Sequence, residues 1–393
     1  MKNLFPIFQN NPGLVYLDSA ATTQTPQSVL DAMNNYYVQS RSNVHRGLYE
    51  LAEQATAAYE KARDTVAAFL SAKREEIIFV PNATYGLNIL AQMLESKMQP
   101  GDNIVLTRLE HHANLIPWQQ VVLKNGGTLR YIEIRDYLID ERSIESVIDQ
   151  TTAVVSFCLV SNVLGTIAPT EQIIKRAKTM GAISVVDATQ AVAHMRIDVK
   201  ALDCDALIFS GHKMYGPTGI GVMYVRHELL ETLQPVIFGG GMVKNVTYET
   251  AKWNDIPYRF EPGTVPIAEV IGLGAAIEFL QNIGFDSIEH QEQTLMQYAL
   301  EKFISIPGFR LIGLNNFPRG SVISFQIAGT HDSDIAFFCA KQNIAIRSGH
   351  HCAYPLMHHL GLSGVVRASC GVYTEKDDID RCVEVLIRLK KIC

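Results

Sequence analysis

The sequence predicts an α/β protein with a large domain, built on a mostly parallel sheet, and a smaller α+β domain at its C-terminal end. Its 393 residues exceed the usual length of one domain, and 47% of them are hydrophobic, which is enough for more than one core. From about residue 77 to residue 225, short β-branched segments alternate with amphipathic ones. Strands separated by helices in this way form parallel sheets that are covered on both faces.

The predicted strands of the large domain are short apolar segments. They comprise residues 77–80, 103–107, 128–134, 153–158, 183–187, 206–210 and 221–225. Helical periodicity appears between several of them, at residues 84–97, 112–125 and 171–181. The last of these helices is closed by Gly181, a residue type that favours helix C-termini.

A change of pattern after residue 230 marks the predicted domain boundary. Residues 238–266 are rich in glycine and proline and show no alternation of strands and helices. We therefore expect a large domain at residues 15–260 and a small domain at residues 261–393, with residues 1–14 joined to the small domain. The small domain is predicted to contain a helix at 268–284, strands at 321–327 and 365–369, and a final helix from about Glu375.

The composition argues against several kinds of partner. The formal net charge is −6 and no long run of Lys or Arg occurs, so a surface for nucleic acid is not expected. The N-terminal segment lacks the pattern of a signal peptide, and no apolar run is long enough to span a membrane. The seven cysteines are scattered and form no CxxC motif, which predicts free thiols in a reducing compartment. We expect a cytoplasmic protein that binds neither nucleic acid nor membrane.

Lys213 stands out by its setting. It lies in SGHKMYGPTGIG, residues 210–221, directly after a predicted strand. A lysine that forms a Schiff base must be neutral for part of the time, and a confined site near other cations lowers its pKa toward that state. The alternative is an ordinary surface lysine. The GPTGIG run lacks the GK[ST] ending of a phosphate loop and precedes a strand, so it is interpreted as a tight turn.

Asp187 ends the predicted strand at residues 183–187, where α/β sheets place ligand groups. A carboxylate at this position could keep a pyridinium nitrogen protonated, which lets a pyridoxal ring accept electrons from a carbanion. A strand-turn-strand passage separates Asp187 from Lys213, so both side chains could reach one ring. The alternative is that Asp187 caps a helix.

Three further strand ends carry candidate groups. The turn PNATYG leads into a helix N-terminus, where Thr84 could donate to a phosphate or only cap the helix. The segment EHHAN, residues 110–114, follows another strand; its His111 could stack on an aromatic cofactor and move protons, or the histidine pair could only begin a helix. Arg367 could hold a carboxylate through two hydrogen bonds or form a structural ion pair.

The last unusual cluster is RSGHHC, residues 347–352. Buried cysteines are usually inert, and we expect this of Cys158, Cys339 and Cys382. Cys352 differs, because its arginine, glycine and histidine neighbours predict a reactive thiol on a mobile loop. Adjacent histidines match no standard zinc spacing, so no metal is expected here.

Together these segments resemble the group II cysteine desulfurases, the SufS/CsdA type among class-V aminotransferase-like enzymes. The likeness extends from about residue 14 to the C-terminus. The strings that carry it are YLDSAAT (16–22), NVHRG (43–47), EHHANLIPW (110–118), SNVLGT (161–166), VDATQAV (186–192), SGHKMYGPTGIG (210–221), RSGHHCA (347–353) and RAS (367–369). The chain departs from the family pattern at Ala83, which replaces a hydroxyl residue in the phosphate loop.

The resemblance implies an enzyme of fold type I that uses pyridoxal 5'-phosphate (PLP) and has a seven-stranded sheet in its large domain. It implies cofactor contacts from Lys213 (Schiff base), Asp187 (pyridine nitrogen), Gln190 (ring hydroxyl), His111 (ring stacking), and Thr84, Ser210 and His212 (phosphate). It further implies a homodimer in which Thr264 reaches the phosphate of the other subunit.

The reaction that the resemblance implies is a desulfuration. Asn162 and Arg367 would hold the carboxylate of L-cysteine, and Cys352 would receive the sulfur as a persulfide while L-alanine leaves. A sulfur-acceptor protein of the SufE/CsdE kind, or a scaffold, would then take up the sulfur for iron-sulfur clusters or other compounds. The alternatives are a selenocysteine lyase, a cysteine sulfinate desulfinase or an aminotransferase of the same fold, and, in another class, a PLP-binding sulfur-relay scaffold.

Overall fold

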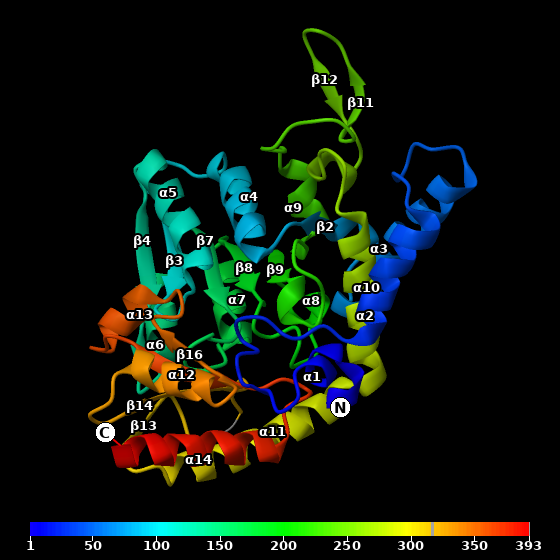
Figure 1. The fold of residues 1–393 in the computed structure, drawn as a ribbon. Helices are drawn as coiled ribbons and strands as arrows, with labels where there is room; N and C mark the ends of the chain where they lie inside the picture. Colours follow the sequence, from blue (N-terminus) through cyan, green and yellow to red (C-terminus); the bar gives the residue numbers. More distant parts are fainter. Residues whose placement is uncertain (316–317, 393) are drawn as a thin grey trace.

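A seven-stranded sheet lies at the centre of the molecule (Figure 1). The computed structural model describes residues 1–315 and 318–392. In spatial order the strands are β2 (Ile77–Val80), β10 (Gly221–Val225), β9 (Ala206–Ser210), β8 (Ile183–Asp187), β7 (Thr152–Cys158), β3 (Asn103–Thr107) and β4 (Thr128–Ile132). Strand β10 runs antiparallel to β2 and β9, and the other pairs are parallel. The predicted mostly parallel sheet is confirmed.

Successive side chains of the strands enter two different cores, because neighbouring residues of a strand point to opposite faces. In β2, Ile77 packs on one face and Ile78 on the other. The first face is covered by α3 (Glu50–Leu70), α7 (Thr170–Thr179) and α10 (Ile267–Ile283), and the second by α4 (Ala83–Glu95) and α5 (Ile116–Asn125). The inner strands are therefore buried on both faces, which explains why they are mostly apolar, whereas the edge strand β4 is partly exposed and carries Arg130.

A second sheet, with four antiparallel strands, forms the core of the C-terminal region (Figure 1). Its order is β13 (Phe309–Ile312), β14 (Val322–Ile327), β17 (Val365–Ser369) and β16 (Arg347–Gly349). Helices α11 (Phe285–Ile304), α12 (Asp332–Lys341) and α14 (Lys376–Ile392) pack on this sheet or beside it. The N-terminal strand β1 (Val15–Tyr16) pairs with β15 (Ile344–Ala345) and so joins this region.

The region around the predicted domain boundary contains two features that the sequence pattern did not predict. The Gly/Pro-rich segment, in which no alternation was expected, contains the hairpin β11 (Val243–Val246) and β12 (Ala251–Trp253), which projects from the body (Figure 1). Beyond the predicted boundary, α10 packs against α2 (Gln27–Asn35) and α3. The division of the chain at residue 261 stays a prediction.

The remaining elements are short. They are α1 (Pro6–Asn10), β5 (Ile134–Arg135), β6 (Leu138–Ile139), α6 (Glu141–Val147), α8 (Val199–Leu202), α9 (His227–Thr232) and α13 (Tyr354–His359). Among the described residues, no helix taken singly has the length and apolar character to cross a membrane; α10 and α11 meet the test only as a pair bent by 74°.

Candidate active site

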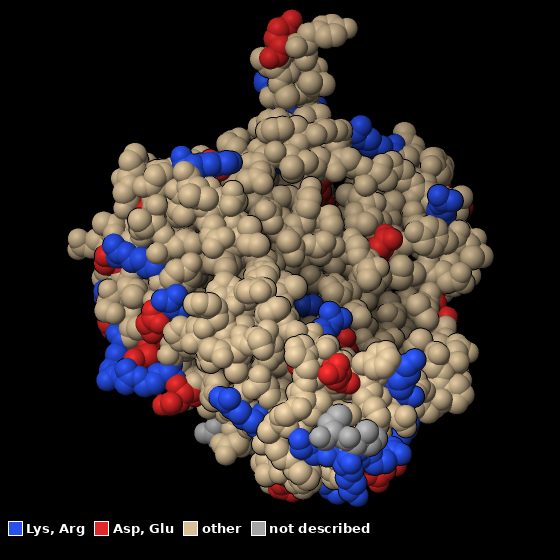
Figure 2. Space-filling view, turned by 60° about the vertical axis from the view of Figure 1, so that its left-hand side comes forward, with Lys and Arg blue, Asp and Glu red and all other residues tan. Residues whose placement is uncertain are grey.

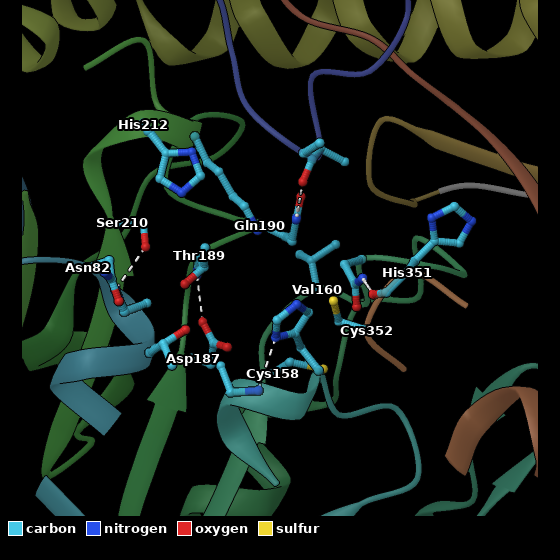
Figure 3. A pocket seen from close by; sticks show the side chains of 18 of the residues that line it. Asn82, Cys158, Val160, Asp187, Thr189, Gln190, Ser210, His212, His351 and Cys352 are labelled. Carbon is cyan, nitrogen blue, oxygen red and sulfur yellow. Dashed lines mark hydrogen bonds between the residues drawn. The ribbon is translucent and has the colours of Figure 1, made fainter. Parts of the chain in front are cut away.

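A cavity of about 660 Å³ lies where the carboxyl ends of the parallel strands meet the C-terminal region. Figure 3 shows Ser210 and His212 on one side of it and His351 and Cys352 on the other. Ten of the eleven predicted site residues line this cavity: Thr84, His111, Asn162, Asp187, Gln190, Ser210, His212, Lys213, Cys352 and Arg367. Most of these residues follow strand ends at one edge of the large sheet, as expected, whereas Cys352 and Arg367 come from the C-terminal region.

Lys213 is held at the end of a short 3-10 turn that follows β9. Gly211 makes this turn possible, because a Cβ there would stand 2.8 Å from the Ile220 side chain. The GPTGIG run continues into β10 and forms a turn, as predicted. Burial lowers the pKa of Lys213 to about 8, and the charge of Asp187 opposes that shift. An amine with this pKa is neutral for part of the time near physiological pH.

Asp187 is buried at the end of β8 and faces the cavity. Its Oδ1 accepts a hydrogen bond from the Thr189 amide at 3.0 Å, within a turn rather than an α-helix, so the helix-cap alternative is wrong. Burial raises the pKa of this carboxyl. A cationic ring nitrogen beside it would stabilise the ionised form.

The turn after Asp187 supplies two more polar groups. Gln190 Nε2 donates to the Ala20 carbonyl at 2.8 Å, which fixes the amide at the cavity wall. The Thr189 hydroxyl is buried and has no hydrogen-bond partner among the described residues. Because an unpaired buried hydroxyl is costly, it indicates that a polar ligand atom belongs beside it.

The N-terminus of α4 forms the other end of the cavity. Asn82 caps the helix by accepting from the Tyr85 amide at 2.9 Å, so the alternative that Thr84 is the cap is wrong. Ser210 Oγ accepts from the Ala83 amide at 2.8 Å and keeps its own proton for another acceptor. The helix terminus and these hydroxyls suit a phosphate. Burial and the charge of Lys213 lower the pKa of His212 to about 4.

His111 lies between the sheet edge and the Cys352 loop. Its Nδ1 accepts from the Ala113 amide at 3.1 Å, so this nitrogen carries no proton. Burial, with the Lys213 charge, lowers the pKa of His111 to about 4, and the ring is neutral at pH 7. The alternative that the histidine pair begins a helix is met in part, because a 3-10 turn starts at His112.

The residue before His111, Glu110, is fully buried in a network that sequence reasoning did not single out. It accepts from Thr107 Oγ1 at 2.5 Å, the Cys158 amide at 3.1 Å and Asn114 Nδ2 at 2.7 Å. These bonds tie the end of β3 to β7. Burial raises the pKa of Glu110 to about 7. The network fixes the turn that carries His111.

Cys352 is exposed, whereas the predicted inert cysteines 158, 339 and 382 are buried. It follows β16 on a turn in which His351 and Cys352 have φ values of 51° and 55°. Asn162 Nδ2 donates to the His351 carbonyl at 2.8 Å, and the His112 amide donates to the Cys352 carbonyl at 2.7 Å. Two residues of the large domain therefore hold the backbone of this loop at the cavity.

Arg367 enters the same space from β17 and is 2% exposed. Nη1 donates to the Asn162 carbonyl at 3.0 Å, and Nη2 lies 3.2 Å from Asp18 Oδ1. Nε is buried and has no partner among the described residues. The ion-pair alternative is therefore correct, yet the free Nε leaves a donor for a carboxylate.

Side chains of the C-terminal region hold three consecutive carbonyls of the 162–164 turn. Arg367 bonds the first, Ser324 Oγ donates to Val163 O at 2.6 Å, and Arg319 Nη2 donates to Leu164 O at 3.3 Å. Because Asn162 in turn holds the His351 carbonyl, this seam sets the position of Cys352 relative to the sheet.

Thr264 does not join the other predicted residues. It lines a separate cavity of about 260 Å³, together with Asn43, His45, Arg46 and Glu261 among others. Thr264 thus lies outside the main cavity of its own chain, and its role toward another subunit stays a prediction.

Three site features were missed from the sequence. Thr189 and Glu110 lie within three residues of strand ends that were recognised, so the strand-end rule could have included them. Asp18 gives no such signal, since only the fold brings it to Arg367. Within residues 1–315 and 318–392, no group of three His, Cys, Asp or Glu side chains is placed to hold a metal ion.

The residues present fit PLP. The buried Thr189 hydroxyl lacks a partner, Lys213 offers a partly neutral amine, Asp187 faces a ring position, and the α4 terminus with Ser210 and Thr84 suits a phosphate. A sheet edge with this donor set defines a fold-type I enzyme that acts through a lysine of lowered pKa and a PLP cofactor.

Comparison with known proteins places the chain in a family. Residues 15–382 match the model of the family "Aminotransferase class-V", and the chain belongs to this family. A Streptomyces coelicolor protein named "Probable cysteine desulfurase" is 45% identical over 95% of this chain and 91% of its own.

Two solved structures share the fold over the full chain. The apo structure of a cysteine desulfurase from Thermococcus onnurineus NA1 has a TM-score of 0.96 and 40% identity, covering 100% of this chain and 98% of that one. The cysteine desulfurase CsdA from Escherichia coli has a TM-score of 0.93 and 36% identity with the same coverage. The predictions of a fold-type I, class-V aminotransferase-like PLP enzyme and of likeness to the group II cysteine desulfurases are confirmed.

Proposed function

We propose that this enzyme, a PLP-dependent cysteine desulfurase, converts L-cysteine into L-alanine and transfers the sulfur to Cys352 as a persulfide. The observation that carries the proposal is one cavity lined by the partly buried Lys213, whose amine has a lowered pKa, and by the exposed Cys352. The amine is suited to bond changes at the α-carbon, and the thiol is suited to receive sulfur and pass it outward.

The large-domain side of the cavity supports the chemistry at the α-carbon. When bound, PLP withdraws electrons from that carbon. Asp187 would pair with the ring nitrogen and keep it protonated, and that cationic nitrogen would in turn keep the buried carboxyl ionised although burial raises its pKa. His111 contributes a neutral ring. Lys213 Nζ, with a pKa of about 8, takes the α-proton because a large fraction of the amine is neutral near that pH.

The small-domain side binds the substrate and removes its sulfur. Arg367 and Asn162 hold the carboxylate, which leaves the thiol group toward Cys352. The Cys352 thiolate attacks the substrate sulfur, so an S–S bond forms, the C–S bond breaks and its electron pair stays on the β-carbon. The β-carbon then takes up a proton, the α-carbon regains the kind of proton that Lys213 removed, and alanine leaves. Lys213 is the acid for this step, because His111, with its pKa lowered to about 4, is a neutral ring at pH 7 and a much weaker acid than an ammonium group.

Mass spectrometry of the holoenzyme after addition of L-cysteine tests the proposal. We expect the peptide that contains Cys352 to gain one sulfur atom while alanine appears in equal amount. The Cys352→Ala variant is the matched control, and it should keep bound PLP without gaining sulfur. Sulfur on a buried cysteine, or alanine release at the wild-type rate by the variant, would refute the role of Cys352.

A homodimer completes the proposal. Large hydrophobic side chains are exposed around the second cavity and on the projecting hairpin, including Leu48 at 96%, Tyr248 at 106% and Phe238 at 65%. Figure 2 shows the hairpin above a wide surface with few charged residues. Such surfaces in water favour association. In a two-fold dimer, Thr264 would reach the phosphate of the other subunit.

The dimer is tested by sedimentation of the holoenzyme. We expect twice the mass of the chain, and we expect Thr264→Ala to release PLP faster without changing that mass. A monomer with full activity would overturn the dimer.

A separate acceptor is needed for turnover, because a persulfide on Cys352 blocks the next attack. We propose that a sulfur-acceptor protein or a small thiol removes it at the exposed loop. Without a reductant, alanine formation should stop after about one equivalent per active site. Addition of a small dithiol should restore continuous alanine release. Continuous release without any thiol would exclude a persulfide-bound resting enzyme.

A further inference from the structure

Asp18 lies at the back of the cavity and pairs with two arginines. It precedes the cavity residues Ala20 and Ala21 and forms a parallel backbone bridge with Ser369, the last residue of β17. Its carboxylate lies 3.0 to 3.2 Å from Arg347 Nε and Nη2, and 3.2 Å from Arg367 Nη2. One carboxylate thus serves two cations.

The two arginines occupy one face of the small sheet. Arg347 on β16 and Arg367 on β17 are directly paired in the sheet register. Arg367 is 3% exposed at its side chain and Arg347 50%, with Asp18 at 14% between them. Both arginines line the cavity, whereas Asp18 does not. A bound ligand therefore meets the guanidinium groups and not the carboxylate that neutralises one of them.

The net charge of this trio is suited to one anionic group. Two guanidinium groups and one carboxylate leave a single positive charge. His111 and His351 add none at pH 7, because burial lowers their pKa values to about 4 and about 3. The α-carboxylate of an amino acid, held by Arg367, uses the remaining charge.

The charge of Arg347 lies where it would act on the side chain of the substrate. Arg347 begins the segment that ends in Cys352, and both line the cavity. In the proposed function the substrate sulfur must lie at Cys352, so the side chain of the substrate points toward this segment. An unpaired Arg347 would attract an anionic side chain there, and Asp18 removes that attraction.

We propose that Asp18 is a specificity-determining residue that neutralises Arg347 and so favours substrates with an uncharged side chain, such as cysteine, over those with an anionic one, such as cysteine sulfinate. The inference rests on the proposed function for one point, which is that the substrate side chain lies beside Cys352. Asp18 acts through Arg347 and is a positioning residue.

The first test compares two substrates in the holoenzyme. Asp18→Asn keeps the shape of the side chain and removes its charge. We expect the ratio of kcat/KM for L-cysteine sulfinate to that for L-cysteine, measured by alanine release, to rise about fivefold, as expected for release of one partly exposed ion pair. Asp18→Glu, which keeps the charge, should stay within about twofold of the wild-type ratio. An unchanged or lower ratio in Asp18→Asn would overturn the proposal.

A double-mutant cycle assigns the effect to Arg347. Arg347→Gln removes a positive charge and should lower the ratio. The double variant Asp18→Asn/Arg347→Gln restores the original net charge and should return the ratio close to that of the wild type. A ratio that stays high in the double variant would show that Asp18 does not act through Arg347. Thermal unfolding confirms that each variant is folded, and Arg347→Gln alone still tests the charge argument if Asp18→Asn does not fold.

A binding test separates this inference from the proposed function. Succinate and butyrate are inert carboxylates of similar length with two charges and one, and their binding is measured by protection of Cys352 from iodoacetamide. Asp18→Asn should strengthen succinate binding relative to butyrate about fivefold. If neither substrate yields alanine, the proposed function fails while this preference still tests Asp18. If alanine forms but the preference does not move, the specificity role of Asp18 fails alone.

Discussion

The Lys213 side and the Cys352 side of the cavity are built in opposite ways. Asp187 is the buried last residue of β8, and Lys213 lies partly buried on a short turn after β9. The Glu110 network holds Cys158, the register partner of Asp187 on β7. Cys352 is exposed on a turn with two successive left-handed residues and is held by two hydrogen bonds from the large domain.

The difference follows from what each side must do. Exclusion of water is the largest cause of the lowered pKa of Lys213, and the charges of Arg367 and Arg347 add to it. A thiol that receives sulfur from one molecule and passes it to another must reach solvent. The Lys213 side therefore sets the bond changes at the α-carbon, and the exposed Cys352 side sets where the sulfur goes.

The largest expected effect concerns the buried side. Lys213→Ala removes the proton carrier, and we expect alanine formation to fall by at least about 10³-fold. The variant should also lose the visible absorbance of lysine-linked PLP, measured by spectrophotometry. Lys213→Arg keeps the charge and is the matched control that should be equally inactive. Substantial activity in either variant would show that another base acts at the α-carbon.

Cys352→Ala should separate the two sides by substrate. We expect alanine formation from cysteine to fall by about 10²-fold or more, because no thiol receives the sulfur. Selenocysteine and cysteine sulfinate, whose side chains leave more easily, should lose much less. Rates on the three substrates under the same conditions provide the measurement. An equal loss on all three would mean that Cys352 supports the whole site and not sulfur transfer alone.

The Glu110 network should make the stability of the buried side depend on pH. Burial raises the pKa of Glu110 from 4.5 to about 7 in the folded protein, so the unfolded chain ionises first as pH rises. The wild type should therefore lose about 3 kcal/mol of unfolding free energy relative to Glu110→Gln between pH 4.5 and pH 7, with no further change above.

Denaturant unfolding of both proteins at several pH values, without cofactor, provides the measurement for Glu110. If the difference in unfolding free energy between the two proteins is constant over this range, the pKa of Glu110 is not raised in the folded protein. The contrast between the two sides of the cavity would then be weaker.

The pKa of Lys213 gives a smaller effect that can be followed without catalysis. The rate at which cofactor-free protein captures PLP should rise about tenfold per pH unit and level off near pH 8, because only the neutral amine reacts. Since the charge of Asp187 raises the pKa of Lys213, Asp187→Asn should move the plateau to lower pH. A rise that continues toward pH 10.5 would show an ordinary, solvated lysine.

The smallest effect concerns the seam between the two sides. Ser324→Ala removes the buried bond to Val163 O and should lower the unfolding free energy by about 1 kcal/mol. It should also speed alkylation of Cys352 by iodoacetamide, since the 162–164 turn holds the Cys352 loop. Ser333→Ala, in an exposed part of α12, is the control. Unchanged alkylation would mean that the loop is positioned without this seam.

The sequence predicted most of the buried side, because its signals are local. Apolar strands and the residues at their ends follow from periodicity, and Lys213, Asp187 and His111 were found by that rule. The cap of α4 at Asn82 was missed because several polar residues in one turn can serve as the cap, and geometry chooses among them. The unusual composition of residues 347–352 was enough to single out Cys352. Asn162, which holds the Cys352 loop, was predicted only from the resemblance to the family.

The amino-acid sequence by itself determined the strands, the order of the domains and the residue types at each strand end, since these depend on neighbours within a few positions. Only the tertiary structure decided that Thr264 leaves the cavity, that the Thr189 hydroxyl stays unpaired and that Asp18 meets Arg367, 349 residues away. Such contacts depend on the sum of many weak packing interactions across the whole chain, and no local pattern records them.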